Sequence, residues 1–206
     1  MTPRPHDLLR LSAAAAGALP SHAPPWTRGV LRTAPWVVVR RATAPAGFVA
    51  AGIRGADRSH RYAWLVNSDD VQTTLPPEDL ADVGALAGRD VPAILALPKA
   101  REILGEARFP WGPTGSVGFE LATGIPTATS DSDLDLVVRV DQLDAVAVAR
   151  LTTLFERLAH LGVRVDCQVD TPVGAIALAE LVSESSEVLV RTPSGPRLVE
   201  RAVAVR

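Results

Sequence analysis

The stretch between residues 134 and 169 constrains the fold more than any other part of the sequence. Leu134–Val140 is an apolar run with charged residues on both sides, which is typical of a buried strand. Asp141–Leu161 then repeats apolar residues at helical spacing and stops at Gly162, and Val163–Val169 alternates as a strand does. A strand–helix–strand connection of this length puts both strands in one sheet. The second half of the chain is therefore expected to contain a mixed sheet with flanking helices.

The remaining sequence predicts further helices and strands in two domains. The first half is expected to have a helix over Leu8–Leu19, a proline-rich break, and strands at Trp36–Ala42, Phe48–Arg54 and Arg58–Val66. Asn67–Pro77 is polar and ends in a Pro-Pro pair, so we expect a linker there. The second half is expected to have helices at Pro77–Leu86, Val91–Leu104 and Val173–Val182, and strands at Val117–Ala122 and Glu187–Arg191. The predicted fold class is α+β (mixed α/β), with a small β-rich domain over residues 1–75 and a second domain over residues 76–206.

Composition and charge exclude several classes of protein. The 206 residues include one cysteine, Cys167, which excludes a disulfide framework and a cysteine-rich zinc site. No apolar run reaches the roughly 18 residues that cross a bilayer, so we expect a cytoplasmic protein without a membrane partner. The net charge is −2, but it is unevenly distributed: residues 1–64 contain nine arginines and two acids, an excess of positive charge. This excess is too small to predict nucleic-acid binding. It indicates that the first half meets an anionic group or is neutralised by the acidic second half.

The residues that suggest chemistry lie between Gly112 and Val140. Side chains two apart in a strand point to the same face, so Asp133 and Asp135 project together while their leucine neighbours enter the core. Adjacent carboxylates repel each other unless a cation lies between them, and hard oxygen ligands suit Mg²⁺ better than zinc. The pair therefore predicts a magnesium site.

Two further features fit the same site. Gly115 and Ser116 lie in a glycine-rich turn, where backbone amides can approach phosphate oxygens. Asp166 lies in the strand after the long helix and joins the pair if the two strands are neighbours. Three carboxylates with two Mg²⁺ ions and a polyphosphate form a site for phosphoryl or nucleotidyl transfer. The cations that a polyphosphate needs are expected from Arg54, Arg58, Arg61 and Lys99.

The sequence resembles the nucleotidyltransferase superfamily in its Gly-Ser turn, its Asp-x-Asp strand and its later strand acid. Over nearly the whole chain it is similar to one family, the phosphoribosyl-dephospho-CoA transferases (holo-acyl-carrier-protein synthases) of the malonate decarboxylase system. The segments that carry this resemblance are Arg4-Pro-His-Asp-Leu-Leu, Trp36-Val-Val-Val-Arg-Arg, WGPTGSVGFELATG from Trp111, Ser132-Asp-Leu-Asp-Leu and Thr171-Pro-Val-Gly-Ala.

The resemblance implies a reaction, a partner and a role for each site residue. A serine of the apo acyl carrier subunit of malonate decarboxylase would attack triphosphoribosyl-dephospho-CoA and release diphosphate. Asp133 and Asp135 would be the catalytic metal-binding pair, with Asp166 as the third acid. Gly115 and Ser116 would bind the triphosphate. The domain over residues 76–206 would then be nucleotidyltransferase-like.

Two other functions stay open at this point. The same acids would serve a nucleotidyltransferase with another donor, such as ATP, because the sequence marks no base-specific pocket. A non-catalytic assembly factor that binds the carrier protein is the second alternative. The arginines of the first half suit either the triphosphate or an acidic carrier protein.

Overall fold

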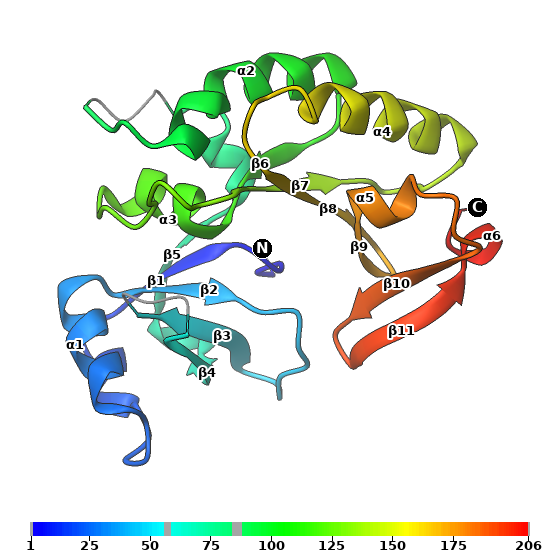
Figure 1. The fold of residues 1–206 in the computed structure, drawn as a ribbon. Coiled ribbons are helices and arrows are strands. Elements are labelled where there is room, and N and C mark those ends of the chain that lie inside the picture. Colours follow the sequence, from blue (N-terminus) through cyan, green and yellow to red (C-terminus); the bar gives the residue numbers. More distant parts are fainter. Residues whose placement is uncertain (1, 56–58, 84–87, 206) are drawn as a thin grey trace. The chain divides into compact units, whose positions relative to one another are not determined.

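The chain forms two compact units, Met1–Pro76 and Pro77–Arg206, each built around its own sheet (Figure 1). The computed structural model describes residues 2–55, 59–83 and 88–205. One sheet is antiparallel and the other is mixed, and helices accompany both. The expectation of an α+β fold with mixed α/β content is therefore confirmed.

The N-terminal unit is a five-stranded antiparallel sheet in the order β4-β3-β2-β1-β5. Its elements are β1 (Leu8–Leu11), the 3-10 helix η1 (Ala15–Ala18), α1 (Pro25–Thr33), β2 (Trp36–Val39), β3 (Phe48–Arg54), β4 (Arg61–Asn67), η2 (Ser68–Asp70) and β5 (Val71–Leu75). The largest side chains of its core are Leu9, Leu11, Leu19, Leu31, Val37, Val39, Ile53, Trp64 and Val66.

The first strand lies where the sequence predicts a helix. The expectation of a helix over Leu8–Leu19 is wrong, because its first residues form β1 and only the short η1 follows. Leu9 and Leu11 are buried while Arg10 between them is exposed, which is the alternation of a strand. Pairing with β2 on one side and β5 on the other outweighs the helix propensity of the alanine-rich sequence.

Two neighbouring segments also differ from the prediction. The polar stretch Asn67–Pro77, expected as a linker, contains β5, whose Thr74 and Leu75 lie opposite Leu9 and Leu8. α1 has no counterpart in the prediction. It begins at Pro25 inside the proline-rich break, since proline is well tolerated in the first turn of a helix.

The C-terminal unit has a six-stranded mixed sheet in the order β11-β10-β9-β8-β7-β6. Its elements are η3 (Pro77–Leu80), α2 (Pro92–Ala107), β6 (Trp111–Pro113), α3 (Gly115–Thr123), β7 (Leu134–Arg139), α4 (Ala145–Leu158), β8 (Val165–Thr171), β9 (Gly174–Ala177), α5 (Leu178–Leu181), β10 (Glu187–Thr192), β11 (Gly195–Glu200) and α6 (Arg201–Ala204). Within the described residues, no helix combines the length and apolar character needed to cross a lipid bilayer.

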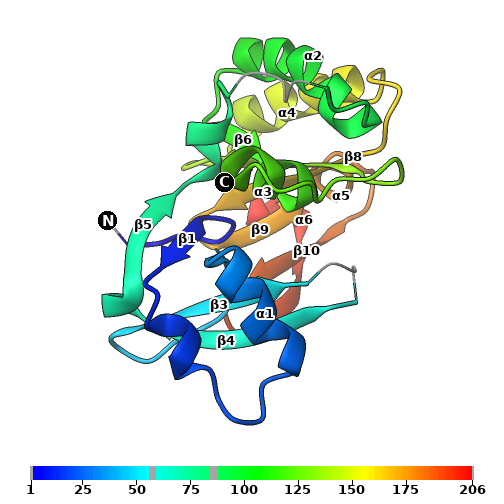
Figure 2. The same cartoon turned by 90° about the vertical axis from the view of Figure 1, so that its left-hand side faces the viewer.

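The predicted strand–helix–strand unit is present in this sheet. β7 and β8 are parallel neighbours, and α4 connects them. α4 begins after Asp144, whose carboxylate accepts the N–H of Ala147 at 2.8 Å, and it buries Leu151, Leu154 and Leu158. α2 and α4 lie on one side of the sheet and α3 lies on the other (Figures 1 and 2).

Three predictions in this unit need correction. Val117–Ala122 belongs to α3 and not to a strand. Six consecutive residues of this nine-residue helix are buried, Ser116–Leu121, so no amphipathic period marks it. The predicted helix Val173–Val182 is split into β9 and the short α5, because β9 pairs with β8. The predicted helix Pro77–Leu86 starts as η3, and its residues 84–86 lie outside the described residues.

Replacing Leu9 by alanine is expected to lower the free energy of unfolding of the N-terminal unit by about 2–5 kcal/mol, because it leaves a cavity in the core. Arg10→Ala, one residue along, is expected to change it by no more than about 0.5 kcal/mol. Urea unfolding followed by tryptophan fluorescence measures both, since Trp26, Trp36 and Trp64 lie in this unit. Equal losses of unfolding free energy in the two variants would contradict the assignment of Leu8–Leu11 as a strand with one buried face.

Candidate functional site

Asp133 and Asp135 lie at the start of β7, and the Asp135 side chain is on the side of the sheet where α3 lies (Figure 1). The carboxylate of Asp135 lies against Gly115, the first residue of α3. Leu134 and Leu136 alternate with the acids and are buried, so they belong to the opposite face. Asp133 directly precedes the strand, and its carboxylate is 3.9 Å from the Arg164 guanidinium.

Gly115 brings the start of a helix against the Asp135 carboxylate. A Cβ atom at this glycine would lie 1.8 Å from Oδ2 of Asp135, and the backbone has a φ of +58°, so both space and conformation require glycine. The backbone N–H of Thr114 donates to the carbonyl oxygen of Asp135 at 2.8 Å, which fixes the two segments together. Ser116 follows as a buried residue in the first turn of α3. The positive end of a helix dipole thus lies beside the acid pair.

Asp166 lies next to Asp135 across the parallel strands. The two residues are Cα partners in the β7–β8 register, and Asp166 is exposed. Residues paired in this way point to the same face of a sheet. The structure therefore brings Asp135 next to both Gly115 and Asp166, and Asp133 lies two residues before Asp135 in the chain.

The predicted cation site is the Asp133–Asp135 pair. Among the described residues, no group of three or more His, Cys, Asp or Glu side chains is placed to hold a metal ion. Two carboxylates suit Mg²⁺, which commonly takes its remaining ligands from water and from substrate phosphates. This donor set fits a magnesium ion that arrives with a phosphate ligand.

The predicted cationic residues lie elsewhere. Lys99 is on α2, across the sheet from Asp135, where its 65% exposed side chain pairs with Glu102 at 2.5 Å. The structure does not bring Lys99 to the carboxylates. Arg54 and Arg61 are partners in the β3–β4 register of the N-terminal unit, and Arg58 lies outside the described residues.

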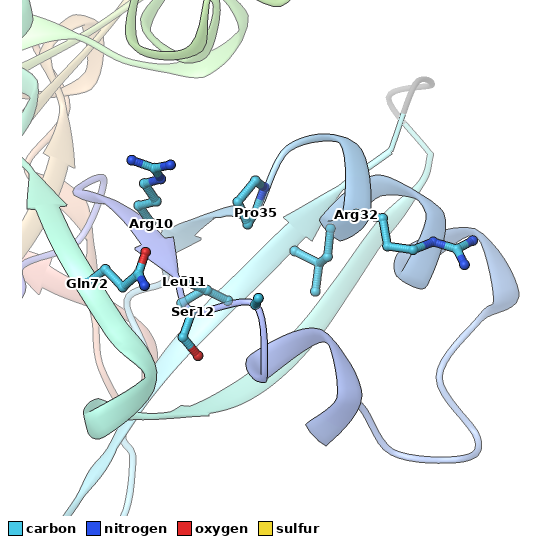
Figure 3. A pocket seen from close by; sticks show the side chains of 8 residues that line it. Arg10, Leu11, Ser12, Arg32, Pro35 and Gln72 are labelled. Atoms are coloured by element: carbon cyan, nitrogen blue, oxygen red, sulfur yellow. The ribbon is translucent and has the colours of Figure 1, made fainter.

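The N-terminal unit contains a pocket of about 340 Å³ that sequence reasoning did not identify (Figure 3). Arg10 on β1 and Arg32 in the last turn of α1 contribute to its rim, and Ser12 donates a hydrogen bond to Asp70 at 3.0 Å. The pocket depends on the pairing of β1 with β5, which the sequence does not predict. Its lining residues are Arg10, Leu11, Ser12, Ala13, Leu31, Arg32, Pro35 and Gln72.

A buried ion pair on α3 is a second feature that sequence reasoning missed. Glu120 is 1% exposed and accepts hydrogen bonds from Arg89 and from the backbone of Thr127 and Ala128. Burial opposes ionisation of Glu120, but these hydrogen bonds and the Arg89 charge outweigh it and hold the pKa of Glu120 below its ordinary value. The available signal was a single acid within an otherwise apolar helix, which requires a partner when it is buried.

Cys167 lies on the covered face of β8. It is 5% exposed and is the Cα partner of Leu136 in the parallel register. Burial, with a contribution from the Asp166 charge, raises the pKa of its thiol to about 12. The side chain therefore acts as an apolar core residue and not as a nucleophile.

Two family models cover both units of the chain. They are described as the phosphoribosyl-dephospho-CoA transferase MdcG N-terminal domain, which matches residues 4–77, and the MdcG C-terminal domain, which matches residues 79–202. No solved structure matches the chain.

Relatives named phosphoribosyl-dephospho-CoA transferase match along nearly the full length. One from Pseudomonas putida is 42% identical over 98% of this chain and 96% of its own. One from Pseudomonas syringae pv. tomato is 42% identical over 95% of this chain and 90% of its own. One from Azotobacter vinelandii is 38% identical over 97% of this chain and 93% of its own. The chain belongs to the phosphoribosyl-dephospho-CoA transferase family, which confirms the resemblance seen in the sequence.

Gly115→Ala is expected to destabilise the protein more than Gly124→Ala. Both glycines have positive φ (+58° and +70°), at the start and just past the end of α3, so each substitution has a conformational cost of about 1–2 kcal/mol. Only at Gly115 would the new Cβ also displace the Asp135 carboxylate; at Gly124 it would meet no described atom within 4 Å. Urea unfolding measures the difference. Equal losses would contradict the close approach.

Cys167 is expected to resist alkylation by iodoacetamide in the folded protein at about pH 8, because the thiolate is the reactive form and a pKa of about 12 leaves very little of it. In denaturant the same thiol is expected to react fully. Intact mass spectrometry at successive times measures both rates. Rapid alkylation of the native protein would contradict the buried position.

Proposed function

We propose that this protein transfers phosphoribosyl-dephospho-CoA from its triphosphate donor to a serine of the apo acyl carrier subunit of malonate decarboxylase, with release of diphosphate. Membership of the family over both units supports the group transferred. The observation that carries the proposal is the Asp135 carboxylate held against the start of α3.

The triphosphate would bind where α3 begins. The first N–H groups of a helix have no acceptor within it and lie at the positive end of its dipole, so Gly115 and Ser116 offer backbone donors to phosphate oxygens. Asp133 and Asp135 would hold Mg²⁺ jointly with the triphosphate, with two ions as in other two-metal sites. When bound, the metal would supply positive charge to the phosphate oxygens and lower the pKa of the attacking hydroxyl.

The reaction is a displacement at the α-phosphorus. The serine oxygen forms a bond to phosphorus, and the bond to diphosphate breaks with its electron pair going to the leaving group. The serine proton passes to a carboxylate. We assign this role to Asp166, because it is exposed beside Asp135 and is not needed to hold the cation.

The N-terminal unit carries arginines that suit an anionic ligand, either a triphosphate or an acidic carrier protein. Arg54 and Arg61 on its sheet are candidates, together with Arg58. Lys99 is no longer a candidate for this role, because it lies across the sheet and pairs with Glu102. Arginine also forms the better bidentate contact with phosphate.

Asp133→Asn and Asp135→Asn are each expected to slow transfer by about 10²- to 10³-fold or more, because each removes charge from the proposed metal site. The assay mixes the protein, Mg²⁺, the apo carrier subunit and the triphosphoribosyl donor, and follows the carrier by intact mass. The expected gain equals phosphoribosyl-dephospho-CoA and disappears with EDTA. Asp141→Asn, an exposed acid just beyond the other end of β7, is the matched control and is expected to keep its rate.

Three outcomes would contradict the proposal. Substantial turnover by either asparagine variant would remove the assigned roles from the acid pair. A mass gain with ATP and not with the triphosphoribosyl donor would indicate an adenylyltransferase. No gain with either donor, from protein shown to be folded, would favour a carrier-binding factor without catalysis.

A further inference from the structure

The loop between α3 and β7 is anchored by a buried carboxylate. Glu120 accepts the Nε–H of Arg89 at 2.5 Å and an Nη2–H of Arg89 at 3.2 Å. It also accepts the backbone N–H groups of Thr127 and Ala128, both at 2.8 Å. Arg89 donates a further hydrogen bond to the carbonyl oxygen of Ala128 at 2.8 Å. One acid and one base thus satisfy three backbone groups in a segment without regular structure.

The anchored loop leads directly to the acid pair. After Ala128, the backbone of Thr129 accepts the N–H of Ser132 at 3.0 Å, and the Ser132 hydroxyl accepts the N–H of Thr129 at 2.9 Å. These bonds close a turn one residue before Asp133. The N–H of Leu134 then donates to the carbonyl oxygen of Arg164 at 2.9 Å and starts the strand pairing. Asp133 therefore lies between a hydrogen-bonded turn and the first residue of β7.

The same helix carries both ends of the site. α3 places Gly115 against Asp135 at its first residue, and it places Glu120 under the loop that ends at Asp133. A charged group that is 1% exposed is costly to bury, and an apolar residue of similar size would often be as stable there. The Glu120–Arg89 ion pair is therefore better explained by the loop conformation that it selects than by a contribution to stability.

We propose that Glu120 and Arg89 are positioning residues that fix Asp133 relative to Asp135 and so determine the affinity of the acid pair for a divalent cation. This inference rests on the proposed function, because it takes the acid pair to be the metal site. Neither residue touches the cation or the substrate in this account. Both act through the backbone of residues 127–132.

The experiment measures Mn²⁺ binding to the full chain by water-proton relaxation, with inorganic triphosphate present and without the carrier protein. Glu120→Gln is expected to raise the dissociation constant for Mn²⁺ by about 10- to 100-fold, the range seen when residues that orient metal ligands are lost. Amide hydrogen exchange in residues 127–134 is expected to accelerate in the same variant. Arg89→Gln is a second variant at a partly exposed side chain, for use if Glu120→Gln fails to fold.

Glu106→Gln is the matched control. Glu106 pairs with Arg157 between α2 and α4, on exposed surface of the same unit, so its loss removes a glutamate–arginine ion pair without touching the loop. It is expected to leave the Mn²⁺ affinity unchanged.

In transfer assays, Glu120→Gln is expected to require a higher Mg²⁺ concentration for half-maximal rate. Its rate is expected to recover when the Mg²⁺ concentration is raised. A loss of folded protein would instead lower the rate at every Mg²⁺ concentration.

Two results would overturn the inference. Mn²⁺ affinity within twofold of the parent in a folded Glu120→Gln or Arg89→Gln protein, with binding still abolished by Asp133→Asn, would leave the proposed metal site intact and remove the positioning role. Absence of Mn²⁺ binding in the parent protein would instead remove the metal site, and the positioning role with it. Mn²⁺ binding by the parent protein, and its loss in Asp133→Asn, distinguish the first failure from the second.

Discussion

The contact between the Asp135 carboxylate and the backbone of Gly115 is the constraint on which the rest of the site depends. It requires β6 and β7 to pair in one register, so that α3 begins beside the acid. It also requires a residue without a Cβ atom at the first position of that helix. Once these conditions are met, the parallel β8 adds Asp166 at the adjacent position. A helix terminus and carboxylates together can hold a phosphate and its cation.

Buried charge is used in the C-terminal unit to hold irregular segments against the sheet. Arg139 on β7 is 7% exposed and contacts Glu78 of η3 at 2.7 Å and Asp170 of β8 at 2.5 Å. Gly112 complements this contact, because a Cβ atom there would collide with the backbone of Pro77. The bridge from Glu120 to the loop before β7 follows the same design. Such bridges select one arrangement of loops around a regular framework, and their net effect on stability is small.

The sequence is sufficient where a pattern has one structural interpretation. The charge-flanked run Leu134–Val140 and the long helix after it predict β7, α4 and β8. The prediction fails for Val117–Ala122, because a helix buried on nearly all sides carries no period. It fails for Leu8–Leu19 because β1 is held by pairing with β2 and β5, and its partners in β5 lie 60 to 67 residues away. Ion pairs between residues far apart in the sequence, such as Glu120 and Arg89, leave no periodic signal.

The central claim is that Asp133, Asp135 and the start of α3 form one binding site for a divalent cation and a triphosphate. Its most direct test is a crystal structure of the protein with Mn²⁺ and inorganic triphosphate, with anomalous scattering used to locate the metal. The account predicts a manganese peak ligated by Asp133 and Asp135, and phosphate oxygens that accept backbone N–H groups at Gly115 and Ser116. A manganese peak at other residues, or triphosphate bound away from α3, would contradict it.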